Sequence, residues 1–234
     1  MTRVTGGGVS TRNPFGPTWA KGAEKADNLG QQVQQELFGK KKPKEVPEDK
    51  DTAAQMARLH AYKGKLARLA GDDENDYSLA LAEGTIAMID AKGKIYIGKS
   101  FLLENADHVD LLVGVMAHEI GHRPKRWAEY RDAQPRTRAE LAELCRTEET
   151  YADFFAGRAL AELGMSPELI CAFLMKLEDG HEDTSPHPEY FPAKLRADVI
   201  REGHSDGARK SETRKKMFPE LAKRVNPKLD LGTG

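Results

Sequence analysis

Residues 109–122 have the sequence VDLLVGVMAHEIGH, an apolar run that ends in two histidines four positions apart. The run predicts a buried helix, because it leaves almost no polar face. On a helix, residues i and i+4 share one face, so His118 and His122 can offer imidazole nitrogens to a single ion. Glu119 projects from nearby and can reach a water bound to that ion. The segment therefore predicts a helix that carries a metal site.

The HExxH pattern in this helix favours zinc. Zinc takes nitrogen and oxygen ligands tetrahedrally, and a catalytic site leaves one position open for water. Such a site makes hydroxide available near neutral pH, with Glu119 as the proton acceptor. The alternative is a core helix with two satisfied histidines, since so short a pattern also occurs by chance.

A third zinc ligand is expected from a second helix, predicted over residues 138–163. Glu149 and Asp153 are four positions apart in it and share a face. We expect Glu149 to ligate the metal and Asp153 to accept a hydrogen bond from the far nitrogen of a ligand histidine, which fixes the ring. Glu148 is the rival ligand. Cys145 lies one turn earlier and could point toward the metal, although a buried small side chain is the simpler interpretation.

The chain resembles the gluzincin metallopeptidases, and most of all the M48 group. HEIGH is followed by EETYADFFAGRALAELGMSP at 148–167, which is similar to the HExxH and later E-x-x-A-D of that group. Upstream, TIAMIDAKGKIYIG at 85–98 is similar to the strand-turn-strand before the active-site helix. Downstream, SPHP at 185–188 with Arg196 is similar to the group's His-Pro segment and its following arginine. The likeness covers roughly residues 51–203.

The resemblance implies a zinc metalloendopeptidase with one Zn²⁺ per chain, held by His118, His122 and Glu149, and with Glu119 as the catalytic base. It also implies that His187 stabilises the oxyanion of the reaction, although a loop histidine in solvent fits the spacing equally well. The implied fold class is α+β. It is a mostly helical zincin domain, with a small β-sheet or hairpin beside the active-site helix and the glutamate helix.

Two alternatives stay open. The short interval between His122 and Glu149 also resembles the ImmA/IrrE type of regulatory peptidase, so one alternative is a narrowly specific regulatory or effector protease. The other is a catalytically silent binding module that keeps the gluzincin fold, against which the intact Glu119 weighs. For the active forms, the expected partner is a peptide or protein substrate.

Composition restricts the class of protein further. The chain has 234 residues and a formal net charge of -1, which argues against a general nucleic-acid binder. No apolar run approaches the length of a transmembrane segment, and the N-terminus lacks the pattern of a secretory signal. Cys145 and Cys171 are the two cysteines, and they do not have the spacing of a metal site. So few cysteines fit a reducing cytoplasm. We expect a cytoplasmic protein, with leaderless export as an effector as the other option. The composition does not predict the oligomeric state.

The expected organisation is a flexible arm and charged linker over residues 1–50, a peptidase domain over 51–203 and a basic helical tail over 204–234. Pro124 should end the motif helix early, because proline lacks a backbone donor. An edge strand of the predicted hairpin could accept an extended peptide. The predicted elements are helices at 52–70, 107–122, 138–163, 166–178 and 193–202 and a β-hairpin at 84–98.

Overall fold

The structure is a computed structural model that describes residues 42–123, 137–179 and 190–217. Within these ranges the fold is α+β, with six α-helices and a four-stranded mixed sheet, so the predicted fold class is confirmed. The helices are α3 (Ala53–Ala70), α4 (Lys99–Glu104), α5 (Val109–Gly121), α6 (Arg138–Leu163), α7 (Glu168–Asp179) and α8 (Ala193–Met217). The strands are β1 (Lys44–Glu45), β2 (Ser78–Glu83), β3 (Ala87–Ile89) and β4 (Lys94–Gly98).

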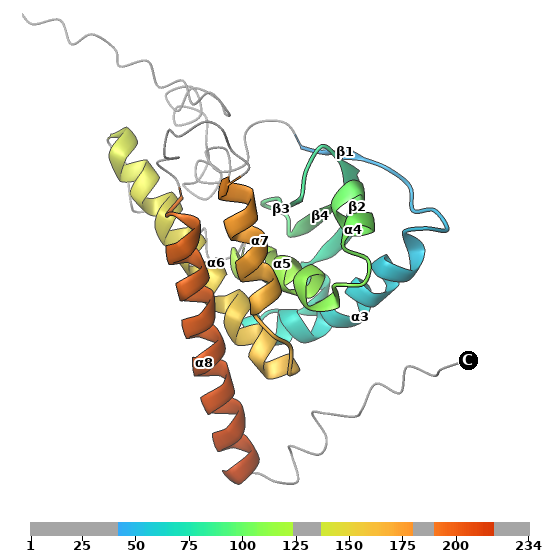
Figure 1. The fold of residues 1–234 in the computed structure, drawn as a ribbon. Helices are drawn as coiled ribbons and strands as arrows, with labels where there is room; N and C mark the ends of the chain where they lie inside the picture. The colour runs from blue at the N-terminus through green and yellow to red at the C-terminus, as the bar shows by residue number, and fades with distance from the viewer. Residues whose placement is uncertain (1–41, 124–136, 180–189, 218–234) are drawn as a thin grey trace, which may run out of the picture.

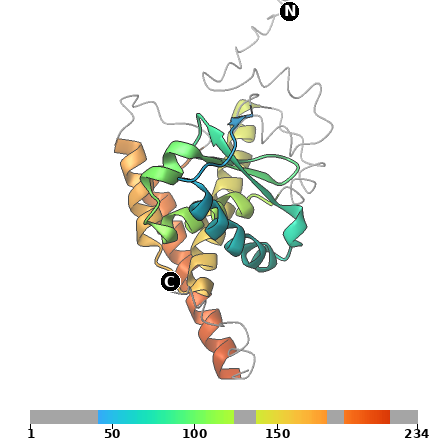
Figure 2. The same ribbon diagram turned by 90° about the vertical axis from the view of Figure 1, so that its right-hand side faces the viewer.

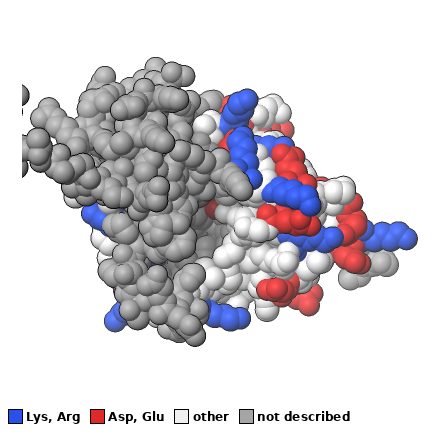
Figure 3. All heavy atoms as spheres, turned by 90° about the horizontal axis from the view of Figure 1, so that it is seen from above, with Lys and Arg blue, Asp and Glu red and all other residues white. Residues whose placement is uncertain are grey.

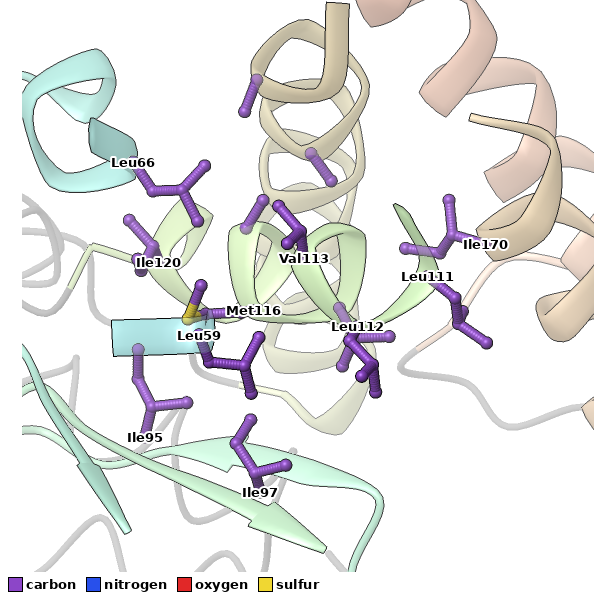
Figure 4. Close-up of a cluster of buried hydrophobic side chains, with 14 of the residues drawn as sticks. Leu59, Leu66, Ile95, Ile97, Leu111, Leu112, Val113, Met116, Ile120 and Ile170 are labelled. Carbon is purple, nitrogen blue, oxygen red and sulfur yellow. The ribbon is translucent and has the colours of Figure 1, made fainter. Parts of the chain in front are cut away.

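The helix α5 lies at the centre of the fold, between the sheet on one side and α6 and α7 on the other (Figures 1 and 2). A helix that is apolar all round is stable only when it is covered on every side. Figure 4 shows side chains of α5 meeting the sheet, α3 and α7 in one cluster. The labelled members of this cluster are Leu59, Leu66, Ile95, Ile97, Leu111, Leu112, Val113, Met116, Ile120 and Ile170.

The sheet has the strand order β1-β2-β4-β3. The strands β3 and β4 are antiparallel, with Met88 opposite Tyr96, which confirms the predicted hairpin with shorter strands. Gly93 closes its turn at a φ of 80°, and a Cβ there would lie 2.0 Å from the carbonyl oxygen of Asp76. The strand β2 pairs in parallel with β4. The strand β1, which lies inside the stretch predicted as a linker, pairs with β2 in antiparallel orientation. Neither β1 nor β2 was expected.

The helix boundaries agree with the sequence where a cap is present. The helix α3 ends before Gly71, which has a φ of 80°. The helix α6 begins after Thr137, whose side chain accepts a hydrogen bond from the N–H of Glu140 at 3.2 Å. The helix α5 ends at Gly121, as early as expected, while Pro124 itself lies outside the described residues.

The helix α8 is longer than expected. The sequence predicts a helix over 193–202 and a separate basic helical stretch that begins at Lys210, whereas α8 runs from Ala193 to Met217 without a break. Its glycines explain the difference. A Cβ on Gly203 would lie 2.1 Å from the carbonyl oxygen of Phe154 in α6. On the other helix, a Cβ on Gly157 would lie 1.9 Å from the carbonyl oxygen of Ile200. These glycines therefore allow α6 and α8 to touch along their backbones and do not mark a helix end.

The helices α5 and α6 also approach closely, at Gly121. A Cβ there would lie 2.8 Å from the Cα of Ala152. We therefore expect Gly121→Ala to force the two helices apart and to lower the free energy of unfolding by about 1–3 kcal/mol, as overpacking does. Gly114→Ala in the same helix is the matched control, since its Cβ would meet only side-chain atoms, at 3.3 Å.

Urea unfolding of both glycine variants measures the difference. The control should stay within about 1 kcal/mol of wild type, because alanine also favours a helix by about that amount over glycine. Equal stabilities for Gly121→Ala and Gly114→Ala would contradict the close approach of α5 and α6 at Gly121.

The described surface carries charges of both signs. Seen from above, acidic and basic side chains are interspersed on it (Figure 3). Among the ion pairs, Lys44–Glu83 joins β1 to β2, and Lys94–Glu45 joins β4 to β1. None of the helices in the part of the chain that the structure describes has both the length and the apolar character to span a bilayer.

Candidate metal centre

One stripe of α6 faces the motif helix. Glu148, Glu149, Ala152 and Asp153 are all buried. Their spacing of i, i+1, i+4 and i+5 puts them on one side of a helix. Ala152 is the residue that Gly121 touches. The close contact between α5 and α6 therefore brings three carboxyl groups of α6 to His118 in α5 and to His122 directly after it.

His118, His122 and Glu149 form a group that could hold a metal ion, and their ligand atoms all lie within 4.8 Å of one another. Nε2 of His118 lies 3.4 Å from Oε2 of Glu149, and Nε2 of His122 lies 3.6 Å from Oε1. Bonds of about 2.0–2.2 Å to a tetrahedral zinc place neighbouring ligand atoms about 3.3–3.6 Å apart. The donor set and these two distances are compatible with a metal ion held among the three residues.

The imidazole of His118 contacts a second carboxyl group through its other nitrogen. Nδ1 lies 3.0 Å from Oδ1 of Asp153. Asp153 in turn accepts hydrogen bonds from Arg196, at 2.8 Å from Nε and 3.0 Å from a terminal nitrogen. Arg196 also donates to Oε2 of Glu149 at 2.9 Å. One guanidinium thus holds the carboxylates of Glu149 and Asp153 in place, and Asp153 holds the ring of His118.

Glu119 is buried beside this group, with 5% of its surface exposed. Its Oε2 has no hydrogen-bond partner among the residues that the structure describes. Burial raises the pKa of the Glu119 carboxyl above its ordinary value of 4.5, although His122 and His118 act in the opposite direction. A buried carboxylate oxygen without a partner is costly, so its position next to a candidate metal site points to a chemical role.

The charges of the metal-free group are balanced by protons and by Arg196. Burial alone would lower the pKa of His118, but the carboxylates of Glu149 and Asp153 outweigh it and raise that pKa to about 10. Burial alone would raise the pKa of Glu149, but Arg196 and His118 lower it to about 2. In the absence of metal, His118 is therefore a cation at neutral pH and Glu149 an anion.

The other residues singled out from the sequence fall elsewhere. Glu148 lies near the opposite nitrogen of His122, with Oε1 3.8 Å from Nδ1, so it does not join the group of three. Cys145 is buried but is not part of the group either. His187 lies outside the described residues.

Tyr190 is a neighbour of the site that sequence reasoning did not find. The guanidinium carbon of Arg196 lies 5.2 Å from the centre of its ring. Burial, and then the charge of Glu149, raise the pKa of the phenol well above its usual range, so Tyr190 stays protonated. In the sequence, Tyr190 follows Pro188 of the His-Pro segment by two positions, and this proximity was the signal that could have pointed to it.

Comparison of the chain with protein-family models, with curated proteins and with solved structures finds no match.

Proposed function

We propose that this chain is a zinc metalloendopeptidase of the gluzincin type. In this proposal His118, His122 and Glu149 hold one Zn²⁺, Asp153 positions His118, and Glu119 is the general base. The observation that carries the proposal is the buried carboxyl group of Glu119 beside three ligand atoms within 4.8 Å of one another. Two imidazoles, one carboxylate and an adjacent carboxylate that does not ligate the metal are the set that metal-assisted hydrolysis needs.

The chemistry divides between the metal and the protein. Zinc in this position supplies a Lewis acid for the scissile carbonyl and lowers the pKa of a bound water to about 7. Glu119 accepts the proton of the attacking water and passes it to the leaving amine. Arg196 keeps Glu149 and Asp153 in their places. His187 remains our candidate for the donor to the oxyanion.

A substrate could bind along the sheet. Among the described residues, β3 is an edge strand with β4 as its one neighbour. The backbone of Ile89, at the end of β3, lies near the Glu119 carboxyl group and acts to lower its pKa. An extended peptide that paired with β3 would run past the proposed base. Main-chain pairing of this kind demands little of the peptide sequence, which favours peptides and unfolded segments as substrates.

The test uses the full chain, stripped by a chelator and then reloaded with zinc. We expect one zinc per chain by elemental analysis. We also expect cleavage of unfolded casein that disappears on chelation and returns with zinc. His122→Gln should lose both zinc and cleavage. A chain that binds zinc but cleaves neither casein nor a peptide library would contradict the proposal and favour a silent binding module.

The same chain with and without residues 1–50 addresses the breadth of its substrates. Cleavage sites mapped in a whole proteome should be many for a general endopeptidase. A single dominant site that depends on residues 1–50 would favour the narrowly specific alternative and would make this arm a recognition segment.

Zinc binding should release a proton from His118. The pKa of its imidazole is about 10 without metal, and only a deprotonated nitrogen can ligate. At pH 7.5 we expect about one proton to be released per zinc bound, and the affinity to rise about tenfold per pH unit up to a pH of about 10. Calorimetric titration in two buffers of different ionisation enthalpy measures this release. Asp153→Asn removes one of the carboxylates that raise the pKa of His118 and should reduce the number of protons released. A heat of binding independent of the buffer would contradict the assignment.

A further inference from the structure

The strongest unassigned feature is the carboxyl group of Glu148. Its side chain has an exposed fraction of 0%, as does that of His122. Burying a carboxylate away from water is costly unless a donor or a cation lies beside it. The nitrogen that faces Glu148 is Nδ1 of His122, 3.8 Å from Oε1. This is the nitrogen that points away from Glu149, which faces Nε2 at 3.6 Å.

The arrangement repeats what is seen at the first histidine. At His118, Nε2 faces Glu149 at 3.4 Å, while Nδ1 faces Asp153 at 3.0 Å. Each imidazole thus lies between Glu149 and a second carboxyl group of the same helix. Glu148 and Asp153 flank Glu149 in the sequence, by one residue before and four after, and both stay on the buried stripe of α6.

We propose that Glu148 is a positioning residue for His122, which accepts the proton of its Nδ1 and keeps Nε2 directed at the metal. This rests on the proposed metal site but does not require that the site be catalytic. An acceptor on the far nitrogen of a ligand histidine fixes its tautomer and its ring orientation and raises its basicity. The separation of 3.8 Å is longer than a hydrogen bond, so the contact must shorten when the site is loaded.

The packing of the two helices explains why Glu148 can do this. Gly121 precedes His122 and touches the backbone of Ala152, one turn after Glu148. Without a side chain at Gly121, the last turn of α5 lies close enough to α6 for neighbouring carboxyl groups to reach opposite nitrogens of one ring. The sequence made Glu148 the rival candidate for the third metal ligand, whereas this geometry places it beside the nitrogen of His122 that does not face Glu149.

The test measures zinc affinity of the full chain, by competition with a chromophoric chelator and with Zn²⁺ alone as the probe. Glu148→Ala should weaken zinc binding by about 10–100-fold. Glu148→Gln should lose less, because its carbonyl oxygen can accept the same hydrogen bond. Glu143→Ala is the matched control, since Glu143 lies on the same helix and is exposed, and it should bind zinc as the wild type does.

A second measurement separates positioning from a merely structural role. Nitrogen NMR of ¹⁵N-histidine-labelled protein loaded with zinc reports the tautomer of His122. We expect the proton on Nδ1 in the wild type, and a mixture or a shifted resonance in the variants. Should Glu148→Ala not fold, Glu148→Gln decides. If the wild type binds zinc, and the variants bind it with the same affinity and show the same His122 resonances, the assignment of Glu148 is overturned while the metal site stands. No zinc binding by the wild type would overturn the metal site, and this assignment with it.

Discussion

Replacing Glu119 with glutamine is expected to leave zinc bound and to remove hydrolysis. Glu119 is not one of the three residues that could hold the metal, so the loss of its charge leaves the ligand set intact. A positioned general base contributes about 10²–10⁴-fold to a rate, and the turnover of casein should fall by about that factor. Glutamine has nearly the same size, so the buried position should accept it without loss of packing.

Two measurements on the same preparations make this prediction sharp. Elemental analysis should give one zinc per chain for the wild type and for Glu119→Gln, and less for Glu149→Gln, which removes a proposed ligand. Cleavage of casein should be lost in both variants. Full activity in Glu119→Gln would exclude Glu119 as the base, whereas loss of zinc from it would make Glu119 a ligand.

The helices around the site were predictable because their signals are local. The apolar run of α5 spans almost four turns, and α6 begins at a capping box made by Thr137 and Glu140. Gly164, with a φ of 73°, ends it. Such caps and periodicities are set by neighbours in the sequence, and the predicted bounds of α6, 138 to 163, are those of the structure.

The elements that were missed depend on distant partners. The strand β2 has six residues, and its partner in register is β4, with Leu81 opposite Ile97. A short strand of alanine and leucine cannot be told from a helix by its pattern alone. The length of α8 depends on Gly203, which local rules treat as a helix breaker but which packs against the backbone of Phe154 in α6. Local rules could not weigh that contact.

The same limit applied inside the site. The spacing of Glu149 and Asp153 predicted that they share one face of the helix. It did not predict which histidine Asp153 would reach. That choice depends on where α5 crosses α6, and the crossing is fixed by Gly121 against Ala152. Glu148 and Glu149 are neighbours with the same side chain, so only the crossing decides that Glu149 lies between the two rings.

Removing Arg196 should have the largest effect on the stability of the metal-free protein. Arg196 is 14% exposed and pairs with Glu149 and Asp153, which are 3% and 2% exposed. Breaking a buried pair from one side leaves charges without compensation and costs about 3–5 kcal/mol. We expect Arg196→Met to lose about that much in urea unfolding with a chelator present. The stability of Arg196→Lys should lie between those of the wild type and Arg196→Met. Lysine keeps a positive charge, but its ammonium cannot reproduce the planar fork of the guanidinium.

Arg201→Met is the matched control for this prediction. Arg201 also lies on α8 and also pairs with a carboxylate, that of Glu168, but the two are 46% and 61% exposed. An exposed ion pair contributes less than about 1 kcal/mol, so this variant should stay close to the wild type. Similar losses for Arg196→Met and Arg201→Met would contradict the burial of the Arg196 pairs.

The pH dependence of the Arg196 variant follows from Glu149. Its pKa is about 2 in the folded protein, below its ordinary value of 4.5, so its contribution to stability is complete above pH 4.5 and is lost as the pH falls toward 2. Without Arg196 the folded pKa rises toward the ordinary value, and the decline between these pH values becomes shallower. Zinc supplies the missing positive charge at Glu149, so saturating zinc should stabilise Arg196→Met more than it stabilises the wild type. An equal gain from zinc in both proteins would show that Arg196 and the metal do not act on the same carboxylate.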